Sequence, residues 1–484
     1  MYDISITKET DELRGVESNL WDPSRPDDGL PHTTNPIWYD LFAIIRRPWF
    51  NRAWVIQELA MAPQATVMCG ENKVLWDELE QVFKYLAVSG FALAFAPMAL
   101  NNFLIMSHAR GVARSKVTQS ALHVLMRHRQ TLASDPRDKV FAFGGLCSAT
   151  HDDSLAMKPD YGTDFREIYT MFAVSTLLNS QNLDILSVPR VQETSLNADL
   201  PSWVPDWSVF DRTTSLQDWE GLVDKKWIVA PRYMATGLSK CKPIFSNSHT
   251  RLGLRGIIVE CILHAGPECR SKLDQDDLAK TSDLSFVIHS QRVLKTWEDI
   301  SACRIFWWHY PTGEKLIDVY WQTLLAGHLY ESFEKTQQIF QRWDQTNQAF
   351  RCLQLVYLDR PWFLSMIIYG MSLAGGIVWF LGWMGVFNYM LNFSPQTLFK
   401  NIAWPVTNRS LFKTESGYIG IGPKLIRRGL DGDHIAFCEG GGLPLIVRPS
   451  GDEWEIIGDC YVYGWMKGEF YEMLKDDMKM MWFF

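Results

Sequence analysis

One stretch of this chain, from Pro361 to Phe399, contains no charged residue, and it constrains the possible fold more than any other feature. The window from Ser365 to Leu391 is apolar enough and long enough for one transmembrane helix. Two spans would need two runs of about 20 apolar residues each, which a stretch of this length with a turn cannot supply. The sequence therefore predicts either a single span or a hydrophobic helical hairpin that is buried against the protein or lies on a membrane surface.

The topology of the chain favours the hairpin. The tryptophans are spread along the stretch, and its glycines weaken a helix in water but are tolerated in lipid, so these residues do not decide between the two structures. A single span would place the strands expected between Leu411 and Phe470 across the bilayer from the segments against which they should pack. We therefore favour a hairpin that breaks near Gly375 and Gly376, with the single span as the alternative.

Composition and charge exclude several classes of protein. A chain of 484 residues with 47% hydrophobic content can form two or three globular units, each with its own core. Because 55 acidic residues outnumber 47 basic ones and no block of Lys or Arg occurs, nucleic acid is not expected as a partner. The N-terminus carries acidic residues where a signal peptide needs an apolar core, so we expect a cytoplasmic protein, with membrane association through residues 361–399 as the alternative.

The cysteines and aromatic residues indicate an ordinary intracellular core. The nine cysteines form no Cys-x-x-Cys pair and lie near no pair of histidines at metal-ligand spacing. We therefore expect reduced, mostly buried thiols and neither a metal nor a cofactor. The 21 tryptophans, in a chain that is 13% aromatic, predict an aromatic-rich core.

Local patterns divide the chain into five regions. These are a mobile lead-in (1–35), a region of helices and strands (36–150), a mixed α/β middle region (151–360), the uncharged stretch (361–400) and a β-rich segment (401–484) that packs on the rest.

Within these regions, apolar spacing and breakers predict individual elements. A first helix is expected to start at Pro36, with Asn35 as its cap. Further helices are expected over Arg52 to Met61, Trp76 to about Leu93, Gln119 to Arg129, and Phe165 to Leu178. The turn Gly70-Glu71-Asn72 after Ala65 to Cys69 predicts a β-hairpin, and Leu252 to Cys261 is expected to be a strand.

Several separated stretches carry a resemblance to a known family. They are RPWFNRAWVIQELAMAPQATVMCGENKVLW (Arg47 to Trp76), SDPRDKVFAFGGL (Ser134 to Leu146), DYGTDFREIYTMFA (Asp160 to Ala173), LPSWVPDWS (Leu200 to Ser208), GYIGIGP (Gly417 to Pro423), GDHIAFCEGGGLPLIVR (Gly432 to Arg448) and GDCYVYGWMKGE (Gly458 to Glu469). In this order and spacing they resemble the fungal heterokaryon-incompatibility (HET) family. The residues that match the family motifs are Arg52, Trp54, Gln57, Gly70, Asp135, Arg137, Asp138, Trp203, Asp206, Trp207, Gly432, Asp433, Pro444, Arg448, Gly464, Gly468 and Glu469.

The sequence also departs from the family. HET domains begin with a Tyr-x-x-Leu-Ser-Tyr-x-Trp-Gly segment followed by Asp-Ala-x-Cys-Ile-Asn-Gln, and neither pattern occurs here. We therefore expect a HET protein that lacks the first half of the domain, through truncation or a misplaced start. The fold class that the resemblance implies is α/β, as a truncated TIR-like region, followed by mixed α+β and a mostly β C-terminal segment.

The TIR resemblance makes Glu58 a candidate catalytic residue. Some TIR-like proteins cleave the nicotinamide glycosidic bond of NAD with a Glu, and this chemistry needs a carboxylate beside the ribose and a cradle for the pyrophosphate. The matching carboxylate here is Glu58, but the segment that would supply the cradle is absent. We therefore favour a structural role, in which Gln57 and Glu58 hold their helix against Arg52 or Arg47 by hydrogen bonds.

Two further motifs have simpler explanations than ligand binding. Asp135, Arg137 and Asp138 could use Arg137 and a helix N-terminus to bind an anion, although a helix cap with a local ion pair is favoured. The glycines at 440–442 and 417–422 are not followed by helices, as phosphate loops require, and we interpret both as turns between strands.

Together these features predict a self/non-self recognition or signalling protein that triggers incompatibility-type cell death through protein partners, without catalysis. Two alternatives stay open, namely an NAD-cleaving enzyme that uses Glu58 and a regulator tethered to a membrane by residues 361–399.

Overall fold

A computed structural model describes residues 35–88, 97–115, 119–147, 159–190, 200–209, 213, 215–217, 220–223, 226–229, 233–270, 283–305, 307–329, 332–357, 404–424 and 426–484. The lead-in up to residue 34 and the uncharged stretch lie outside this set, so what we expect of them stays a prediction. Among the helices in the described residues, none has the length and apolar character needed to cross a membrane.

The chain divides into two units. The helical unit comprises Met1–Phe165 and Asp224–Trp227, and the barrel unit comprises Arg166–Val223 and Ile228–Phe484. The five-region division, with its boundaries near residues 150, 360 and 400, stays a prediction.

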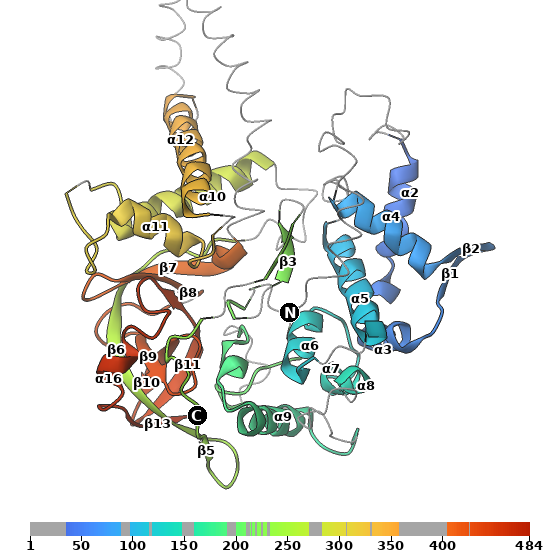
Figure 1. The fold of residues 1–484 in the computed structure, drawn as a ribbon, viewed down its shortest axis with the longest axis horizontal. Helices are drawn as coiled ribbons and strands as arrows, with labels where there is room; N and C mark the ends of the chain where they lie inside the picture. Colours follow the sequence, from blue (N-terminus) through green and yellow to red (C-terminus); the bar gives the residue numbers. More distant parts are fainter. Residues whose placement is uncertain are drawn as a thin grey trace, which may run out of the picture. The chain divides into compact units, whose positions relative to one another are not determined.

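In its described residues, the helical unit contains helices and the strand pair β1–β2 (Figure 1). Its elements are α2 (Ile37–Ile45), the 3-10 helix η1 (Pro48–Asn51), α3 (Ala53–Met61), β1 (Thr66–Cys69), β2 (Asn72–Leu75), α4 (Trp76–Val88), α5 (Pro97–Ser115), α6 (Ala121–His128), α7 (Asp138–Phe141) and α8 (Gly144–Cys147).

Local sequence explains where several of these elements begin and turn. The Asn35 side chain accepts the backbone N–H of Ile37 at 3.0 Å, so α2 starts where a capping residue precedes Pro36. In the hairpin, Cys69 pairs with Asn72, and Gly70 has a φ of +62°, a left-handed conformation that favours glycine. The predicted hairpin is therefore confirmed.

The core of the helical unit is aromatic. Phe103 of α5 is fully buried, and its ring centroid lies 4.8 Å from those of both Trp76 and Phe83. Sequence periodicity did not identify α5, which supplies this central ring. The described strands of this unit, β1 and β2, form one antiparallel pair, so the open α/β sheet of a TIR-like fold is not confirmed.

From residue 165 onward the chain alternates helices and strands before it becomes mostly β. The elements are α9 (Phe165–Ser180), η5 (Asp184–Ser187), β3 (Glu220–Val223), β4 (Lys226–Val229), β5 (Ile244–Phe245), β6 (Leu252–Ala265), α10 (Asp283–Ser301), α11 (Leu316–Leu324), α12 (Phe333–Tyr357), η8 (Trp404–Val406), β7 (Arg409–Thr414), β8 (Ile419–Pro423), β9 (His434–Cys438), β10 (Leu445–Ser450), β11 (Glu453–Asp459), β12 (Tyr461–Val462), α16 (Tyr471–Leu474) and β13 (Lys479–Phe483). The mostly β C-terminal segment is confirmed.

Five strands of this unit close into a barrel. Around the ring, β6 pairs with β13, β13 with β11, β11 with β10, β10 with β9, and β9 returns to β6. The long strand β6 closes the ring because its first residues pair with β13 and its middle residues pair with β9, in a pairing whose register shifts between Ile258 and Glu260. Its last residues pair with β7, and the sheet continues from β7 through β8 to β12. The predicted strand at Leu252 to Cys261 is therefore confirmed, and it forms the side of the barrel that does not come from the C-terminal segment.

The prediction for the glycines at 417–422 holds for Gly417, which lies in the turn between β7 and β8 with a φ of +92°, but not for Gly420 and Gly422. Gly420 and Gly422 lie inside β8 instead of in a turn. Glycine occupies these two positions because neighbouring atoms leave no room for a side chain. A Cβ at Gly422 would come within 2.5 Å of Ile446 Cδ1, and one at Gly420 would meet the Phe412 ring and the backbone oxygen of Tyr461. The glycines at 440–442 do form a turn between β9 and β10, as predicted.

Helices α10 and α11 pack beside β7 and β8, and α12 packs on α10 and α11 (Figure 1). Trp297 of α10 is fully buried, and its indole N–H donates to the carbonyl of Pro267 at 2.9 Å, just beyond the end of β6. This contact fixes α10 to the barrel. Cys352 aside, every cysteine of the chain is described as a free thiol, and all of these except Cys69 are buried.

Candidate functional site

In the helical unit, Arg137 joins two turns of the chain. The Asp135 carboxylate accepts the Arg137 Nε–H at 2.9 Å and an Nη2–H at 2.7 Å, which makes a two-point ion pair. Arg137 Nη1 donates to the carbonyls of Tyr161 and, at 3.1 Å, Thr163. We call Asp135, Arg137, Tyr161 and Thr163 the Arg137 clamp.

Electrostatics within the clamp follow from these bonds. Hydrogen bonding by Arg137 lowers the pKa of the Asp135 carboxyl below its ordinary value. Tyr161 donates its hydroxyl to Asp138 at 2.7 Å, and this bond raises the pKa of Tyr161 to about 12. Arg137 and Asp138 therefore both have partners inside the clamp region.

An open depression of about 400 Å³ lies beside the clamp. It is lined by Ser134, Asp135, Pro136, Arg137, Asp164 and Phe165. The Arg137 N–H groups point to Asp135 and to two carbonyls, so the geometry favours the local ion pair over the anion site. In the residues that the structure describes, no group of His, Cys, Asp and Glu side chains could hold a metal ion.

Gln57 and Glu58 have different surroundings although they are neighbours on α3. The Gln57 Oε1 accepts the backbone N–H of Gly145 at 3.0 Å and so ties α3 to α8. Glu58 is exposed and, within the described chain, forms no ion pair with Arg47 or Arg52. The predicted contact with an arginine is therefore wrong, because Gln57 reaches a backbone amide and Glu58 faces solvent.

The other family-motif residues of this unit shape the backbone around α3. Arg52 caps α3 in an extended conformation and forms a β-bridge with Leu132, while Trp54 is half-buried and Gly70 forms the hairpin turn described above. None of these positions places a second reactive side chain beside Glu58.

In the barrel unit, the motif LPSWVPDWS packs through its two tryptophans. Trp203 lies 5.6 Å from the Phe245 ring and Trp207 lies 5.9 Å from the Phe172 ring of α9, and both indoles are buried. Asp206 accepts the Ser208 backbone N–H at 2.9 Å, which closes a local turn. The motif therefore joins α9 to the β-rich part of the unit.

Asp433 and Arg448 form a buried ion pair in the barrel. Asp433 is fully buried and accepts the Arg448 Nε–H at 2.8 Å, an Arg448 Nη2–H at 3.1 Å and the Arg427 backbone N–H at 2.8 Å. Gly432 lies so close to the backbone of Arg427 and Arg428 that a Cβ has no space. Sequence resemblance alone singled out these positions, and the structure gives them a shared structural role.

The remaining motif residues form turns around the last strands. The Pro444 carbonyl accepts the Cys460 backbone N–H at 3.0 Å, and Gly464 and Gly468 have φ of +85° and +84°. Glu469 accepts the Lys467 backbone N–H at 2.7 Å. These residues position the chain between β12 and α16.

Sequence reasoning missed a second ion pair in the barrel. Arg409 of β7 and Asp459 of β11 lie 2.7 Å apart, and their side chains are 1% and 3% exposed. The two residues are separated by 50 positions, so no local pattern connects them. Asp459 lies in the quoted GDCYVYG stretch, but only its burial reveals its role.

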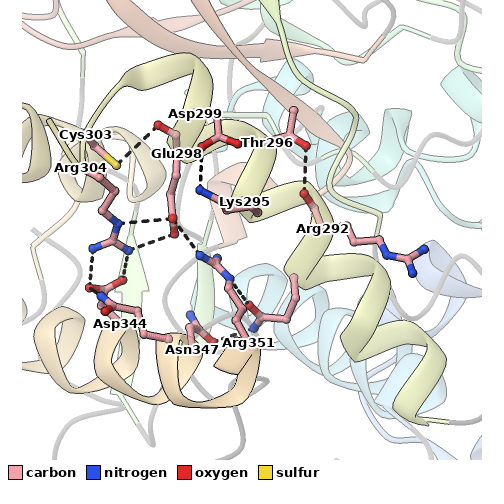
Figure 2. A network of polar contacts seen from close by, with 12 residues as sticks. Arg292, Lys295, Thr296, Glu298, Asp299, Cys303, Arg304, Asp344, Asn347 and Arg351 are labelled. Carbon is pink, nitrogen blue, oxygen red and sulfur yellow. Dashed lines mark hydrogen bonds and ion pairs between the residues drawn. The ribbon is translucent and has the colours of Figure 1, made fainter. Parts of the chain in front are cut away.

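A larger network was also missed, and it links α10 with α12 (Figure 2). Glu298 and Asp344 are its carboxylates, and Arg304 and Arg351 are its cations. Glu298 sits between the two arginines, with its oxygens 3.1 Å from Arg304 Nη2 and 2.8 Å from Arg351 Nη1. Unlike the motif residues, none of these four lies in a stretch that resembles the family.

Comparisons with known proteins fit this arrangement. The model of the Het-6 beta-barrel domain matches residues 387–480, a range that contains β7 to β12 but neither β6 nor the end of β13. A curated relative, the heterokaryon incompatibility protein 6, OR allele, of Neurospora crassa, is 24% identical, with an alignment that covers 88% of this chain and 65% of the relative. The chain thus spans less than two thirds of the length of that relative. No solved structure matches the chain.

A closed barrel whose matched motifs form buried ion pairs and turns defines a protein with a Het-6 type β-barrel domain. With the motifs found along its length, the chain is similar to the fungal heterokaryon-incompatibility family, as its sequence resemblance indicated.

Proposed function

We propose that this chain acts in fungal heterokaryon incompatibility as a recognition or signalling protein that works through contacts with other proteins. The observation that carries the proposal is the similarity to a protein named for heterokaryon incompatibility, which extends over 88% of the chain. A match of that extent covers both the helical unit and the barrel unit. It therefore supports a role that this chain shares with its relative, and not only a barrel that the two proteins share.

The geometry of the family motifs supports a role without catalysis. Arg137 pairs with Asp135, and Arg448 pairs with the buried Asp433, so these charges stabilise the fold. A catalytic site needs a reactive group beside a base, acid or charge stabiliser that faces the substrate. Glu58 is exposed and has no such companion in the described chain, and therefore no observation favours the NAD-cleaving alternative.

Expression in a fungal host tests the proposal. The chain would be produced in a Neurospora crassa strain, which would then be fused with strains of different incompatibility genotype. We expect growth arrest or cell death in at least one pairing, and loss of that response with Asp433→Asn, which removes a buried charge from the barrel. Glu472→Gln, which removes one partner of an exposed ion pair, should leave the response unchanged.

Equal growth in every pairing, with the chain present at a normal level, would contradict the proposal. A response that persists with Asp433→Asn at the same protein level would show instead that an intact barrel is not required.

A further inference from the structure

Helix α12 is attached to the barrel unit by two different kinds of contact. Near its beginning the contacts are aromatic, since the Trp321 ring of α11 lies 5.3 Å from the Phe333 ring and 6.1 Å from the Phe340 ring of α12. Trp321, Phe340 and Trp343 are all buried. Apolar contacts of this kind do not depend on the charge of any side chain.

Beyond Trp343, the described side chains that join α12 to α10 are polar. Arg304, which follows α10, donates to Asp344 of α12 from Nη1 at 2.8 Å, and Arg351 of α12 donates to Glu298 of α10 at 2.8 Å. Gln291 donates to Asn347 at 2.7 Å, which adds an amide pair.

Glu298 is the centre of this network. Its side chain is only 4% exposed, and it contacts both arginines, whereas Asp344 contacts Arg304 alone of the two. The network holds two carboxylates and two guanidinium groups, so its charges balance. Removal of Glu298 would leave the mostly buried Arg351 without a carboxylate and the partly exposed Arg304 with Asp344 alone, and an unmatched buried charge is unfavourable.

The network is not fully satisfied even when all four charges are present. Arg351 Nη2 and Asn347 Nδ2 are buried and have no hydrogen-bond partner among the described residues. Buried ion pairs gain little net stability after desolvation, and unsatisfied members reduce it further. The described polar contacts of α12 are therefore weaker than its aromatic contacts, while α10 itself is fixed to the barrel through Trp297.

We propose that Glu298, Arg304, Asp344 and Arg351 form a latch that lets the C-terminal half of α12 detach from α10 as a local unit. When the latch opens, Asp344, Asn347 and Arg351 lose the contacts described above, while α10, the aromatic contacts of α12 and the barrel keep theirs. Helix α12 ends at Tyr357, shortly before the uncharged stretch begins at Pro361 in the sequence. The latch thus acts on the helix that directly precedes that stretch in the sequence. This proposal does not depend on the proposed function.

Hydrogen exchange of the full chain, followed by mass spectrometry, tests the latch. With Glu298→Gln we expect exchange in peptides covering 344–357 to accelerate about tenfold or more, because a buried pair is broken. Peptides covering 333–343 and strands β9 to β11 should exchange as in the wild type. Lys295→Gln is the matched control, since Lys295 pairs with Asp299 on the same helix but both side chains are more than half exposed.

A second variant protects the test against misfolding. Arg351→Met removes one cation and leaves the Glu298–Arg304 contact in place, so we expect a smaller acceleration confined to the same peptides. Unchanged exchange in both variants would overturn the latch. So would an acceleration that spreads equally to residues 333–343, α10 and the barrel, because the network would then support the whole unit.

Discussion

Asp433 and Arg448 meet inside the barrel at neighbouring strands, with the carboxylate oxygens 2.8 and 3.1 Å from Arg448 Nε and Nη2. Asp433 directly precedes β9, and Arg448 lies on β10 next to Val447, which pairs with His434. The pair therefore fixes the register of these two strands as well as neutralising two buried charges.

Breaking this pair should destabilise the barrel strongly. Asp433→Asn removes the buried carboxylate and leaves Arg448 only the longer contact, 3.6 Å, with the more exposed Glu455, so we expect a loss of about 3–5 kcal/mol in the free energy of unfolding. Urea denaturation of the full chain measures it. Glu472→Gln serves as the control, because its ion pair with Lys475 is exposed and such pairs contribute about 1 kcal/mol or less. Equal effects of the two changes would contradict the structural role.

Two glycines should respond to alanine in opposite directions. A Cβ at Gly420 of β8 would meet the backbone oxygen of Tyr461, so Gly420→Ala should destabilise the chain by about 1–3 kcal/mol. A Cβ at Gly111 of α5 would meet nothing within 4 Å, and Gly111→Ala should stabilise by about 0.5–1 kcal/mol. Thermal unfolding of both variants measures the effects, and a shift of the same sign in both would count against this packing of β8.

The helical unit should lose stability in mild acid because of His108. Burial, together with the nearby charges of Arg127 and Lys84, lowers the pKa of His108 from 6.5 to about 4. A histidine with a lowered folded pKa contributes stability that is complete above pH 6.5 and is lost as the pH falls towards 4. The loss should reach up to about 3 kcal/mol.

Urea denaturation between pH 7 and pH 4 measures this dependence. His108→Asn should reduce the slope in that window, and the buried His128, whose pKa burial also lowers, should account for part of the slope that remains. An unchanged slope with His108→Asn would assign the acid sensitivity to other groups.

The chain should not cleave NAD through Glu58. Glu58 is exposed and lacks a companion group, so nicotinamide release by the purified protein should equal that of Glu58→Ala. Chromatographic measurement of nicotinamide after incubation with NAD decides the matter. Release that falls with Glu58→Ala would restore the enzyme as the leading function.

Some features of this protein could be predicted from short-range sequence patterns. Asn35 before Pro36 marks the start of α2, and Gly70 marks the hairpin turn, because each requirement is met by the residue itself and its near neighbours. The alternation of short apolar runs and turn residues likewise indicated the strands after residue 411. The family motifs identified Asp433 and Arg448, although not that they pair.

Tertiary structure alone decided how these pieces combine. Strand β6 comes from the middle of the chain and closes the barrel between β9 and β13, a pairing set by shared burial and not by proximity in sequence. The same holds for Arg409 with Asp459, and for Gly420, which looked like a turn residue until the neighbouring strand explained its missing side chain. Local sequence fixes backbone preferences within a few residues, whereas burial and charge pairing depend on which distant strands and helices become neighbours.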